Sequence, residues 1–398
     1  MHSPDPGSLN SDAHVSTGEQ HRLPYVLMRG GTSKAVFLRG DTLPCDKDDR
    51  DATILSLFGS PDPRQIDGLG GADLLTSKLA IIDPPTRPDA DLDYTFAQVS
   101  ITEPVVDYDI NCGNISAAVG AYAVDEALVA IEEPVTTVRI HNTNTGRVLL
   151  AEVPVIDGAA AIAGPYSIHG VPGTGAPIAL DFSQTGGGIT GALLPTGNPC
   201  DLVETSIGPV EITIIDLANL TVFFTAASVG MTGTEAPGEF SDELLDRVSA
   251  VKHAAARLLG MPTDGLTPVP AIVSPPARYL SYATGDPVES AAVDLVARVV
   301  GGRPPVPHKA YPGTLAACTG VAARIPGTTV DQVTRQQRVN PAEIRIGHPS
   351  GVMPVWAAAT LDRGLWHAEQ AVYHRTARRL AEGSAFILRS ALHQRATS

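Results

Sequence analysis

Cys112 stands where a helix rich in small apolar residues is expected to begin. Unpaired amides at a helix start stabilise a nearby negative charge, so a thiol at this place can exchange protons near neutral pH. Asn111 and Asn114 flank the thiol with neutral hydrogen-bonding groups, and Gly113 lets a ligand approach the backbone. Most free cysteines, however, are small buried hydrophobes. The local sequence therefore supports a reactive thiol and a core residue about equally.

A second candidate for proton chemistry, Lys78, ends a turn that contains Gly70 and Gly71 and precedes the apolar run Leu79–Ile82. A lysine beside an apolar strand is readily desolvated, which lowers its pKa and makes a neutral amine available as a base. The alternative is a solvated lysine at a strand end, as the usual exposure of lysine favours. Ser77 adds a hydroxyl next to the amine.

A third segment, Met28–Leu38, joins two expected strands through a glycine pair. Backbone amides in such a turn form a concavity for an anion, and Thr32, Ser33 and Lys34 add donors. We expect this turn to hold a carboxylate or a phosphate. It is not a Walker loop, because the first glycine and the lysine are too close and no helix pattern follows.

The charge of the chain limits its partners. Its 398 residues carry a formal net charge of −15, which argues against binding to nucleic acid. A small anionic substrate must then be held by local cationic or donor groups near the glycine turns. The candidates are Arg29, Lys34, Lys78, Arg278, His308 and Lys309.

The composition is that of a water-soluble enzyme. Hydrophobic residues make up 43% and charged residues 18%, and no apolar run approaches the roughly 18 residues that span a membrane. Residues 1–22 are polar and are expected to form a disordered leader rather than a signal peptide. The four cysteines (45, 112, 200 and 318) show no paired or metal-type spacing, which suits a reduced cytoplasm. We expect no metal and no cofactor, because neither a histidine pair at ligand spacing nor a dinucleotide fingerprint is present.

Many short strands and few helices are expected. The strand patterns are Tyr25–Met28, Tyr94–Val99, Thr137–Ile140, Val148–Val153, Glu211–Ile215 and Thr221–Thr225. The helical patterns are Asp48–Phe58, Gly113–Ala127, Ser241–Leu259, Val288–Val300, Gly313–Arg324 and His367–Ala381. Two of these, Gly113–Ala127 and Gly313–Arg324, are apolar all round and so belong in a core. An α+β fold of two similar domains follows, over 23–195 and 196–398, with the last strand able to return to the first domain.

Several of these segments together resemble the PrpF-type family. They are Arg29–Lys34, Gln65–Gly71 followed by Thr76–Lys78, Asn111–Asn114, Val171–Ile178, Leu194–Asn198, Ile325–Thr328, His348–Gly351 and Arg375–Leu380. That family contains 2-methylaconitate cis-trans isomerase, aconitate and methylitaconate delta-isomerases and 4-oxalomesaconate tautomerase. The resemblance spans about residues 24 to 390, in one order and without large gaps.

The resemblance implies a diaminopimelate epimerase-like fold with the active site between the halves, where both central helices begin. It places Lys78 and Cys112 as the pair that moves a proton next to a carboxylate in an unsaturated di- or tricarboxylic acid. Which of the two is the base stays open. The amides beside Gly113 and Gly313 are expected to stabilise the anionic intermediate.

The remaining expected contacts with the substrate come from both halves. Ser33, Asn111 and Ser350 are expected to orient carboxylates, and His348 either binds a carboxylate or fills the turn before Pro349. The set is completed by Thr32, Gly70, Gly71, Ser77, Asn114, Thr314 and Gly351.

The second helix pattern separates this chain from two-thiol racemases of the same fold. Its start reads Tyr311-Pro312-Gly313-Thr314, with no thiol, and Cys318 lies inside the helix, where a core role is expected. Ala35, the run Ala72–Leu75 and the start of this helix depart from the family pattern.

Three functions are compatible with these features. The first is a cofactor-independent cis-trans or double-bond-shifting isomerase, and the second is a keto-enol tautomerase of an oxaloacid such as 4-oxalomesaconate. The third is a non-catalytic carboxylate-binding accessory protein of an aconitase-like enzyme. Keeping both a base and a thiol favours catalysis. A homodimer or homotetramer is compatible with the sequence.

Overall fold

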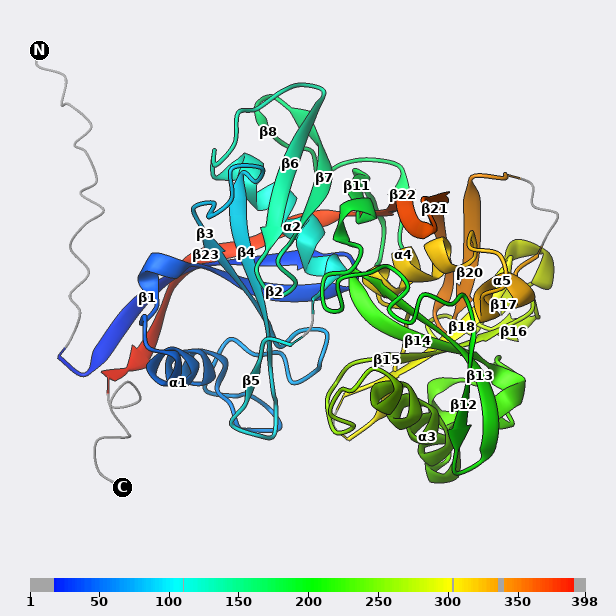
Figure 1. The fold of residues 1–398 in the computed structure, drawn as a ribbon. Helices are drawn as coiled ribbons and strands as arrows, with labels where there is room; N and C mark the ends of the chain where they lie inside the picture. Colours follow the sequence, from blue (N-terminus) through cyan, green and yellow to red (C-terminus); the bar gives the residue numbers. More distant parts are fainter. Residues whose placement is uncertain (1–17, 110, 303, 336–339, 390–398) are drawn as a thin grey trace, which may run out of the picture.

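The computed structural model describes residues 18–109, 111–302, 304–335 and 340–389. Its elements gather in two lobes (Figure 1), with β1 to β8 around α2 in one and β12 to β21 around α4 in the other. The helices of the first lobe are α1 (Lys47–Phe58) and α2 (Gly113–Asp125). Its strands are β1 (Gln20–Gly30), β2 (Ser33–Arg39), β3 (Lys78–Asp83), β4 (Leu92–Val99), β5 (Val106–Asp107), β6 (Val135–Asn142), β7 (Arg147–Ile156), β8 (Ala159–Ala160), β9 (Tyr166–Ser167), β10 (Thr174–Gly175) and β11 (Ile178–Asp181).

The second lobe contains α3 (Asp242–Leu258), α4 (Gly313–Ala322) and the short α5 (Thr329–Val333). Its strands are β12 (Asp201–Thr205), β13 (Gly208–Leu217), β14 (Asn219–Thr225), β15 (Val269–Ser274), β16 (Tyr279–Leu280), β17 (Pro287–Val288), β18 (Leu295–Gly301), β19 (Val306–Pro307), β20 (Glu343–His348) and β21 (Gly351–Asp362). Two long strands, β22 (Leu365–Arg375) and β23 (Ala377–Leu388), complete the chain.

The two lobes repeat one topology. In chain order β1, β2, β3, β4, β6 and β7 pair antiparallel, parallel, antiparallel, parallel and antiparallel. The strands β13, β14, β15, β18, β20 and β21 repeat the same alternation. Each parallel pair requires a crossover, and each crossover includes a helix: α1 and α2 in the first lobe, α3 and α4 in the second. The chain therefore has two similar halves, the diaminopimelate epimerase-like arrangement.

The second crossover helix of each half is buried. Every residue of α4 and every residue of α2 before Asp125 is buried. Alanine and glycine dominate both helices, because strands pack closely around them. The β1 to β7 ribbon continues through β11 into β22 and so into the second lobe. β23 then pairs with β1 from Gln20 to Gly30.

Two expected helices are strands instead. Val288–Val300 holds a 3-10 turn and β18, and His367–Ala381 holds most of β22 and the beginning of β23. β18 is almost wholly buried between partner strands, so its apolar run fits a sheet as well as a helix. In β22 exposure alternates along the strand, and pairing with β11 and β21 overrides the helical preference of its alanines and glutamines.

The expected leader and domain ranges stand as follows. Residues 1–17 lie outside the described residues, and β1 begins at Gln20, inside the expected leader 1–22. The division into 23–195 and 196–398 stays a prediction, with its boundary between β11 and β12. Within the described ranges, no helix is long and apolar enough to cross a bilayer.

Candidate active site

Lys78 is the first residue of β3 and is buried, with 7% of its surface exposed. Its ammonium donates to Gln98 Oε1 at 2.6 Å and lies 5.2 Å from the centre of the Phe96 ring. Burial lowers the pKa of Lys78, while the charges of Cys112 and Asp73 act in the opposite direction. The expected desolvated amine is therefore present, and β3 fixes its position next to the thiol.

Cys112 is the N-cap residue of α2, with extended backbone, and its side chain makes no capping hydrogen bond. The Cys112 sulfur therefore makes no hydrogen bond to the amides of α2, and the thiol is half-buried. Cys318, in contrast, is fully buried in α4, and burial raises the pKa of its thiol strongly. The structure confirms the expected core position of Cys318.

The starts of α2 and α4 face each other across Tyr373. A Cβ at Gly113 would lie 1.9 Å from the Tyr373 hydroxyl and 3.1 Å from Thr314 Cγ2. A Cβ at Gly313 would lie 2.4 Å from the ring of the same tyrosine. Both positions need glycine because the tyrosine fills the space between the helix ends. Thr314 itself accepts a hydrogen bond from Asn219 Nδ2 at 2.9 Å.

The turn between β1 and β2 packs against the first turn of α2. Asn114 Nδ2 donates to Thr32 Oγ1 at 3.0 Å and to Ser33 Oγ at 3.4 Å. Gly31 has a φ of +49°, and a Cβ there would lie 2.2 Å from Asn114 Oδ1. On its other side, Asn114 Oδ1 accepts from Arg375 Nε at 2.8 Å. The anion-binding turn, the helix start and a buried arginine thus meet at Asn114.

The segment before α4 brings His308 towards the amine. The charges of Lys78 and Asp73 act on His308, and burial lowers its pKa to about 4, so this imidazole is neutral at physiological pH. Its Nδ1 accepts a hydrogen bond from the Ala310 amide at 3.1 Å. Lys309 points to a more exposed place, with its ammonium 3.9 Å from an Asp73 carboxylate oxygen.

His348 and the turn that follows it place uncharged groups beside the site. Burial, with nearby cations, holds the pKa of His348 well below its usual value, and its Nδ1 accepts from the Ser350 amide at 3.2 Å. The Ser350 hydroxyl donates to the Lys309 carbonyl, so it ties two loops together. A Cβ at Gly351 would meet His169 Nδ1 at 1.7 Å, and this glycine therefore makes room for His169.

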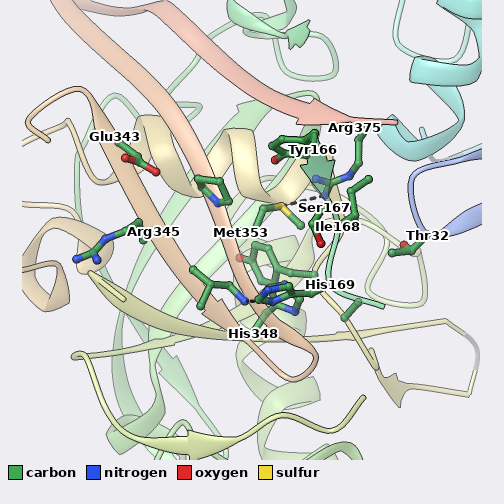
Figure 2. Close-up of a pocket in the computed structure, with 14 residues that line it drawn as sticks. Thr32, Tyr166, Ser167, Ile168, His169, Glu343, Arg345, His348, Met353 and Arg375 are labelled. Carbon is green, nitrogen blue, oxygen red and sulfur yellow. Dashed lines mark hydrogen bonds between the residues drawn. The ribbon is translucent and has the colours of Figure 1, made fainter. Parts of the chain in front are cut away.

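A cavity of about 270 Å³ lies beside these groups. Figure 2 shows its lining, with Arg375 and Thr32 on one side and Glu343 and Arg345 on the other. The lining residues are Thr32, Tyr166, Ser167, Ile168, His169, Ala310, Tyr311, Glu343, Arg345, His348, Val352, Met353, Pro354 and Arg375. Lys78 and Cys112 do not line it; Asn114 on one side and the segment His308–Tyr311 on the other connect it to them.

Three expected cations have other contacts. Arg278 is exposed and pairs with Glu289 at 3.0 Å, away from the cavity lining. Arg29 donates from one nitrogen to the Gly31 and Thr376 carbonyls, which ties the β1–β2 turn to β23. Lys34 is paired through its backbone with Arg29 in the β1–β2 ladder.

The glycine turn before Lys78 is organised by the buried side chain of Gln65. Its amide donates to Ser77 Oγ at 2.8 Å and accepts from the Ala72 amide at 2.8 Å. A Cβ at Gly70 would collide with this side chain, and one at Gly71 would meet Thr76 Oγ1 at 2.2 Å. Ser77 in turn donates to the Val99 carbonyl. These residues shape the loop that carries Lys78.

The segment before Cys112 is held by asparagines. Asn111 is buried and accepts from Asn142 Nδ2 at 3.4 Å, and Asn144 Nδ2 donates to the Tyr108 carbonyl at 2.8 Å. Ile110 lies outside the described residues. Asn111 therefore anchors the thiol loop to β6 and the turn that follows it.

Sequence reasoning missed three residues of the site: Gln98, Tyr373 and Arg375. The interpretation of residues 367–381 as a helix concealed that Tyr373 and Arg375 share the inner face of a strand. Arg375 was noted only as part of a family motif. Gln98 and Phe96 are two residues apart on β4 and share one face of the strand, where both contact the Lys78 ammonium, and the period of two is the sequence signal for this.

In the described part of the chain, no group of three or more His, Cys, Asp or Glu side chains is placed to hold a metal ion. The cationic and neutral donors around Asn114 and His308 suit carboxylates. These donors can therefore form hydrogen bonds to an organic anion in the cavity.

Comparison with known families gives a match to the PrpF protein model over residues 20–388. The chain is 49% identical to a 3-methylitaconate isomerase of Eubacterium barkeri, over 94% of this chain and 99% of that protein. It is 38% identical to a 2-methyl-aconitate isomerase of Shewanella oneidensis, over 92% of this chain and 96% of that protein. A (4E)-oxalomesaconate Delta-isomerase of a Novosphingobium species is 39% identical, over 92% of this chain and 97% of that protein.

Solved structures show the same fold. A crystal structure of a methylitaconate-delta-isomerase superposes with a TM-score of 0.81 at 49% identity, over 96% of this chain and 99% of that one. A hydroxyproline epimerase from Agrobacterium vitis superposes with a TM-score of 0.54 at 12% identity, over 92% of each chain. The second likeness concerns the fold alone.

Proposed function

The chain belongs to the PrpF family and is an isomerase of unsaturated carboxylic acids, and we propose that it moves an allylic proton between Lys78 and Cys112. The observation that carries this proposal is a buried amine whose pKa is affected by the charge of the thiol at the start of α2. The proposed substrates are alkyl-substituted itaconates and aconitates, the acids for which two of the similar enzymes are named.

The proposed reaction begins at Lys78. Its neutral amine removes a proton from the carbon next to the double bond, and the electron pair spreads over the allylic system and the adjacent carboxylate. The Cys112 thiol then donates its proton to the far carbon, or to the same carbon after rotation. A proton passing from the ammonium to the thiolate restores the enzyme, so atoms and charge balance without an oxidant or reductant.

Burial is what makes the amine a base. An ordinary lysine is almost fully protonated at neutral pH, and lowering its pKa by desolvation increases the neutral fraction. The Gln98 side-chain oxygen accepts a hydrogen bond from this amine at 2.6 Å and fixes the direction in which the amine points. The proposed base and the proposed acid lie on separate elements, the beginning of β3 and the N-cap of α2.

The anionic intermediate is expected to lie at the two helix starts. Helix-start amides and dipoles stabilise negative charge, and Gly113 and Gly313 bring both backbones close to the same place. The buried hydroxyls of Tyr94 and Tyr373 have no hydrogen-bond partner among the described residues. Both lie near enough to Cys112 for its charge to raise their pKa further, beyond the effect of burial.

Tautomerisation of an oxaloacid is the second candidate, because a 4-oxalomesaconate tautomerase of Pseudomonas putida is 50% identical over 216 residues, 54% of this chain. The same proton loss starts both reactions, so Lys78 and Cys112 serve either one. A cytoplasmic location and a homodimer or homotetramer remain predictions.

One experiment separates these possibilities. The purified protein is incubated in deuterated water with methylitaconate, methylaconitate, aconitate and 4-oxalomesaconate, and the products are followed by proton NMR. We expect conversion of a methyl-substituted acid, with solvent deuterium at the carbon that is protonated, because the thiol proton of Cys112 exchanges with solvent before it is delivered. Conversion of the oxaloacid alone would favour the tautomerase, and no conversion of any acid would contradict the proposal.

A further inference from the structure

Arg375, near the end of β22, is a buried guanidinium with an unusual set of partners. It is 2% exposed, and its Nε donates to Asn114 Oδ1 at 2.8 Å. One terminal nitrogen donates to the His374 carbonyl at 2.8 Å. The other is 3.0 Å from the thioether sulfur of Met353, and the guanidinium lies 4.8 Å from the Tyr373 ring. All of these partners are neutral.

Within the described ranges, Arg375 has no carboxylate partner. A buried charge is costly unless an opposite charge compensates it, and a thioether sulfur is a weak acceptor. Arg345 lines the same cavity, but its charge is compensated in the ordinary way, because its guanidinium pairs with the Asp294 carboxylate at 2.8 Å. The positive charge at Arg375 is therefore left for an anion that enters the cavity.

The cavity next to Arg375 is built for such an anion. Hydroxyls of Thr32, Tyr166 and Ser167 line it, and His348 is held neutral by burial and by nearby cations. In Figure 2, Arg375 lies beside Tyr166 and Ser167, while Glu343 lies on the far side of the cavity. The guanidinium end near Met353 is thus surrounded by donors and neutral groups.

Asn114 relates this cavity to the proposed chemistry. It bonds Arg375 through its oxygen and Thr32 through its nitrogen, and it follows Cys112 by two residues. The charge of Cys112 is also among those that act on Arg375. A short substrate could therefore place its reacting carbon at the thiol and a second carboxylate at the guanidinium.

We propose that Arg375 binds the carboxylate of the substrate remote from the reacting carbon, so that the enzyme selects acids with at least two carboxylates. This inference rests on the proposed function, because it takes the bound anion to be the substrate of the isomerase. The binding itself is independent of turnover, since a buried unpaired guanidinium attracts a saturated dicarboxylate as well. A monocarboxylate of the same carbon skeleton leaves the charge of Arg375 uncompensated.

The test uses two saturated acids that cannot isomerise, methylsuccinate and 2-methylbutyrate, which differ by one carboxylate. Calorimetry on the full chain measures the Kd of each for the wild type and for Arg375→Gln. We expect Arg375→Gln to raise the Kd of methylsuccinate about 100-fold, which is the effect of a lost charged hydrogen bond in a buried site. The Kd of 2-methylbutyrate should not change. Arg278→Gln, which removes an exposed and paired guanidinium, should change neither Kd.

A second pair of variants keeps the test valid if Arg375→Gln does not fold. Met353→Glu places a carboxylate next to the terminal nitrogen of Arg375 that contacts the Met353 sulfur, and Met353→Gln places a neutral group of the same size there. We expect Met353→Glu to raise Tm and to abolish methylsuccinate binding, and Met353→Gln to keep binding within about tenfold of the wild type.

Unchanged methylsuccinate affinity in Met353→Glu or in a folded Arg375→Gln would overturn the proposal. An equal loss of both acids in Arg375→Gln would also overturn it, because that outcome indicates a general structural effect. If the binding pattern holds but no unsaturated acid is converted, the anion subsite stands and the proposed isomerisation fails. If unsaturated acids are converted without any preference for dicarboxylates, the proposed isomerisation stands and the anion subsite at Arg375 fails.

Discussion

The start of α2 and the start of α4 occupy equivalent places in the two halves, yet only the start of α2 carries a member of the proposed acid–base pair. Both helices are buried crossovers that begin with a glycine, and neither N-cap side chain bonds to its helix. At α2 the N-cap is Cys112, with Lys78 nearby; at α4 the N-cap is Pro312. A repeated fold thus provides two similar helix starts and, at one of them, the proposed reactive pair.

The equivalence extends to how each helix start is held. In the first half the turn after β1 supplies Thr32, which accepts from Asn114, the second residue of α2. In the second half the turn after β13 supplies Asn219, which donates to Thr314, the second residue of α4. The helix residue is the donor in the first half and the acceptor in the second, but in both halves one side-chain hydrogen bond joins the second residue of the helix to a residue at the turn between two strands. The scaffold is therefore symmetric where it positions backbone amides and asymmetric where the proposed proton transfer takes place.

This difference explains why the proposed base comes from a strand. In a two-thiol arrangement each helix start contributes one proton-transfer group. Here Tyr373 fills the space between the helix ends, and Pro312 offers no proton. The second group is Lys78 at the beginning of β3, on the same half as the thiol. Proton loss and return by unlike groups suit a shift of a double bond, in which the two carbons differ.

The largest expected effect comes from removing the base of the asymmetric pair. Lys78→Ala should lower turnover by about 10² to 10⁴, the usual contribution of a positioned general base. Initial rates with the substrate identified by NMR measure the effect, and circular dichroism verifies the fold. Lys47→Ala, which removes an exposed ammonium paired with Asp51, is the matched control and should stay near the wild type.

Turnover of Lys78→Ala close to the wild-type rate would sink the assignment of the base. Alkylation of Cys112 by iodoacetamide provides a second readout, since the thiol should remain accessible in this variant. Cys318 should stay unlabelled because it is fully buried, whereas exposed Cys45 should be labelled in every sample.

A smaller effect is expected from filling the space at each helix start. Gly113→Ala and Gly313→Ala should each lower the free energy of unfolding by about 1–3 kcal/mol, because both new methyl groups collide with Tyr373. Tyr373→Phe removes the hydroxyl that lies 1.9 Å from the Gly113 Cβ position but keeps the ring carbons 2.4 Å from that of Gly313. It should therefore rescue Gly113→Ala and leave Gly313→Ala as unstable as before.

Urea unfolding of the four single and double variants measures this comparison, with Tyr373→Phe alone as the reference. Removal of a hydroxyl that has no partner among the described residues should cost little stability by itself. Equal rescue of both alanine variants would show that the ring, rather than its hydroxyl, adapts at both helix ends.

Much of this arrangement could be predicted from the sequence where one residue type decides the structure. The small-residue composition of α2 and α4 predicted two buried helices, and the helix position of Cys318 predicted a core thiol. The partners of the reacting groups could not be found in that way. Tyr373 and Arg375 lie on a strand whose local sequence favours a helix, and only pairing with β11 and β21 determines its conformation.

Contacts between distant segments account for the other differences. Ser350 and Ser77 were expected to contact substrate, but their hydroxyls donate to the Lys309 and Val99 carbonyls, which are 41 and 22 residues away in the chain. Arg278 is a cation near no glycine turn of the site and pairs with Glu289 instead. A sequence pattern shows which side chains are able to bind an anion, but the partner that each one finds depends on the fold.

The smallest expected effect concerns His308, the neutral group that the α4 side brings near Lys78. Burial lowers its pKa from 6.5 to about 4 in the folded protein, so the unfolded chain binds a proton more readily in the window between these values. The contribution of this imidazole to stability is therefore complete above pH 6.5 and is lost as the pH falls towards 4. The loss should be roughly 1 kcal/mol for each pH unit. His308→Gln has no such proton, so urea unfolding at several pH values should show the wild type losing stability faster than the variant below pH 6.5. Parallel curves would mean that His308 charges freely in the folded protein, and the α4 side would then present a cation to the substrate in acid.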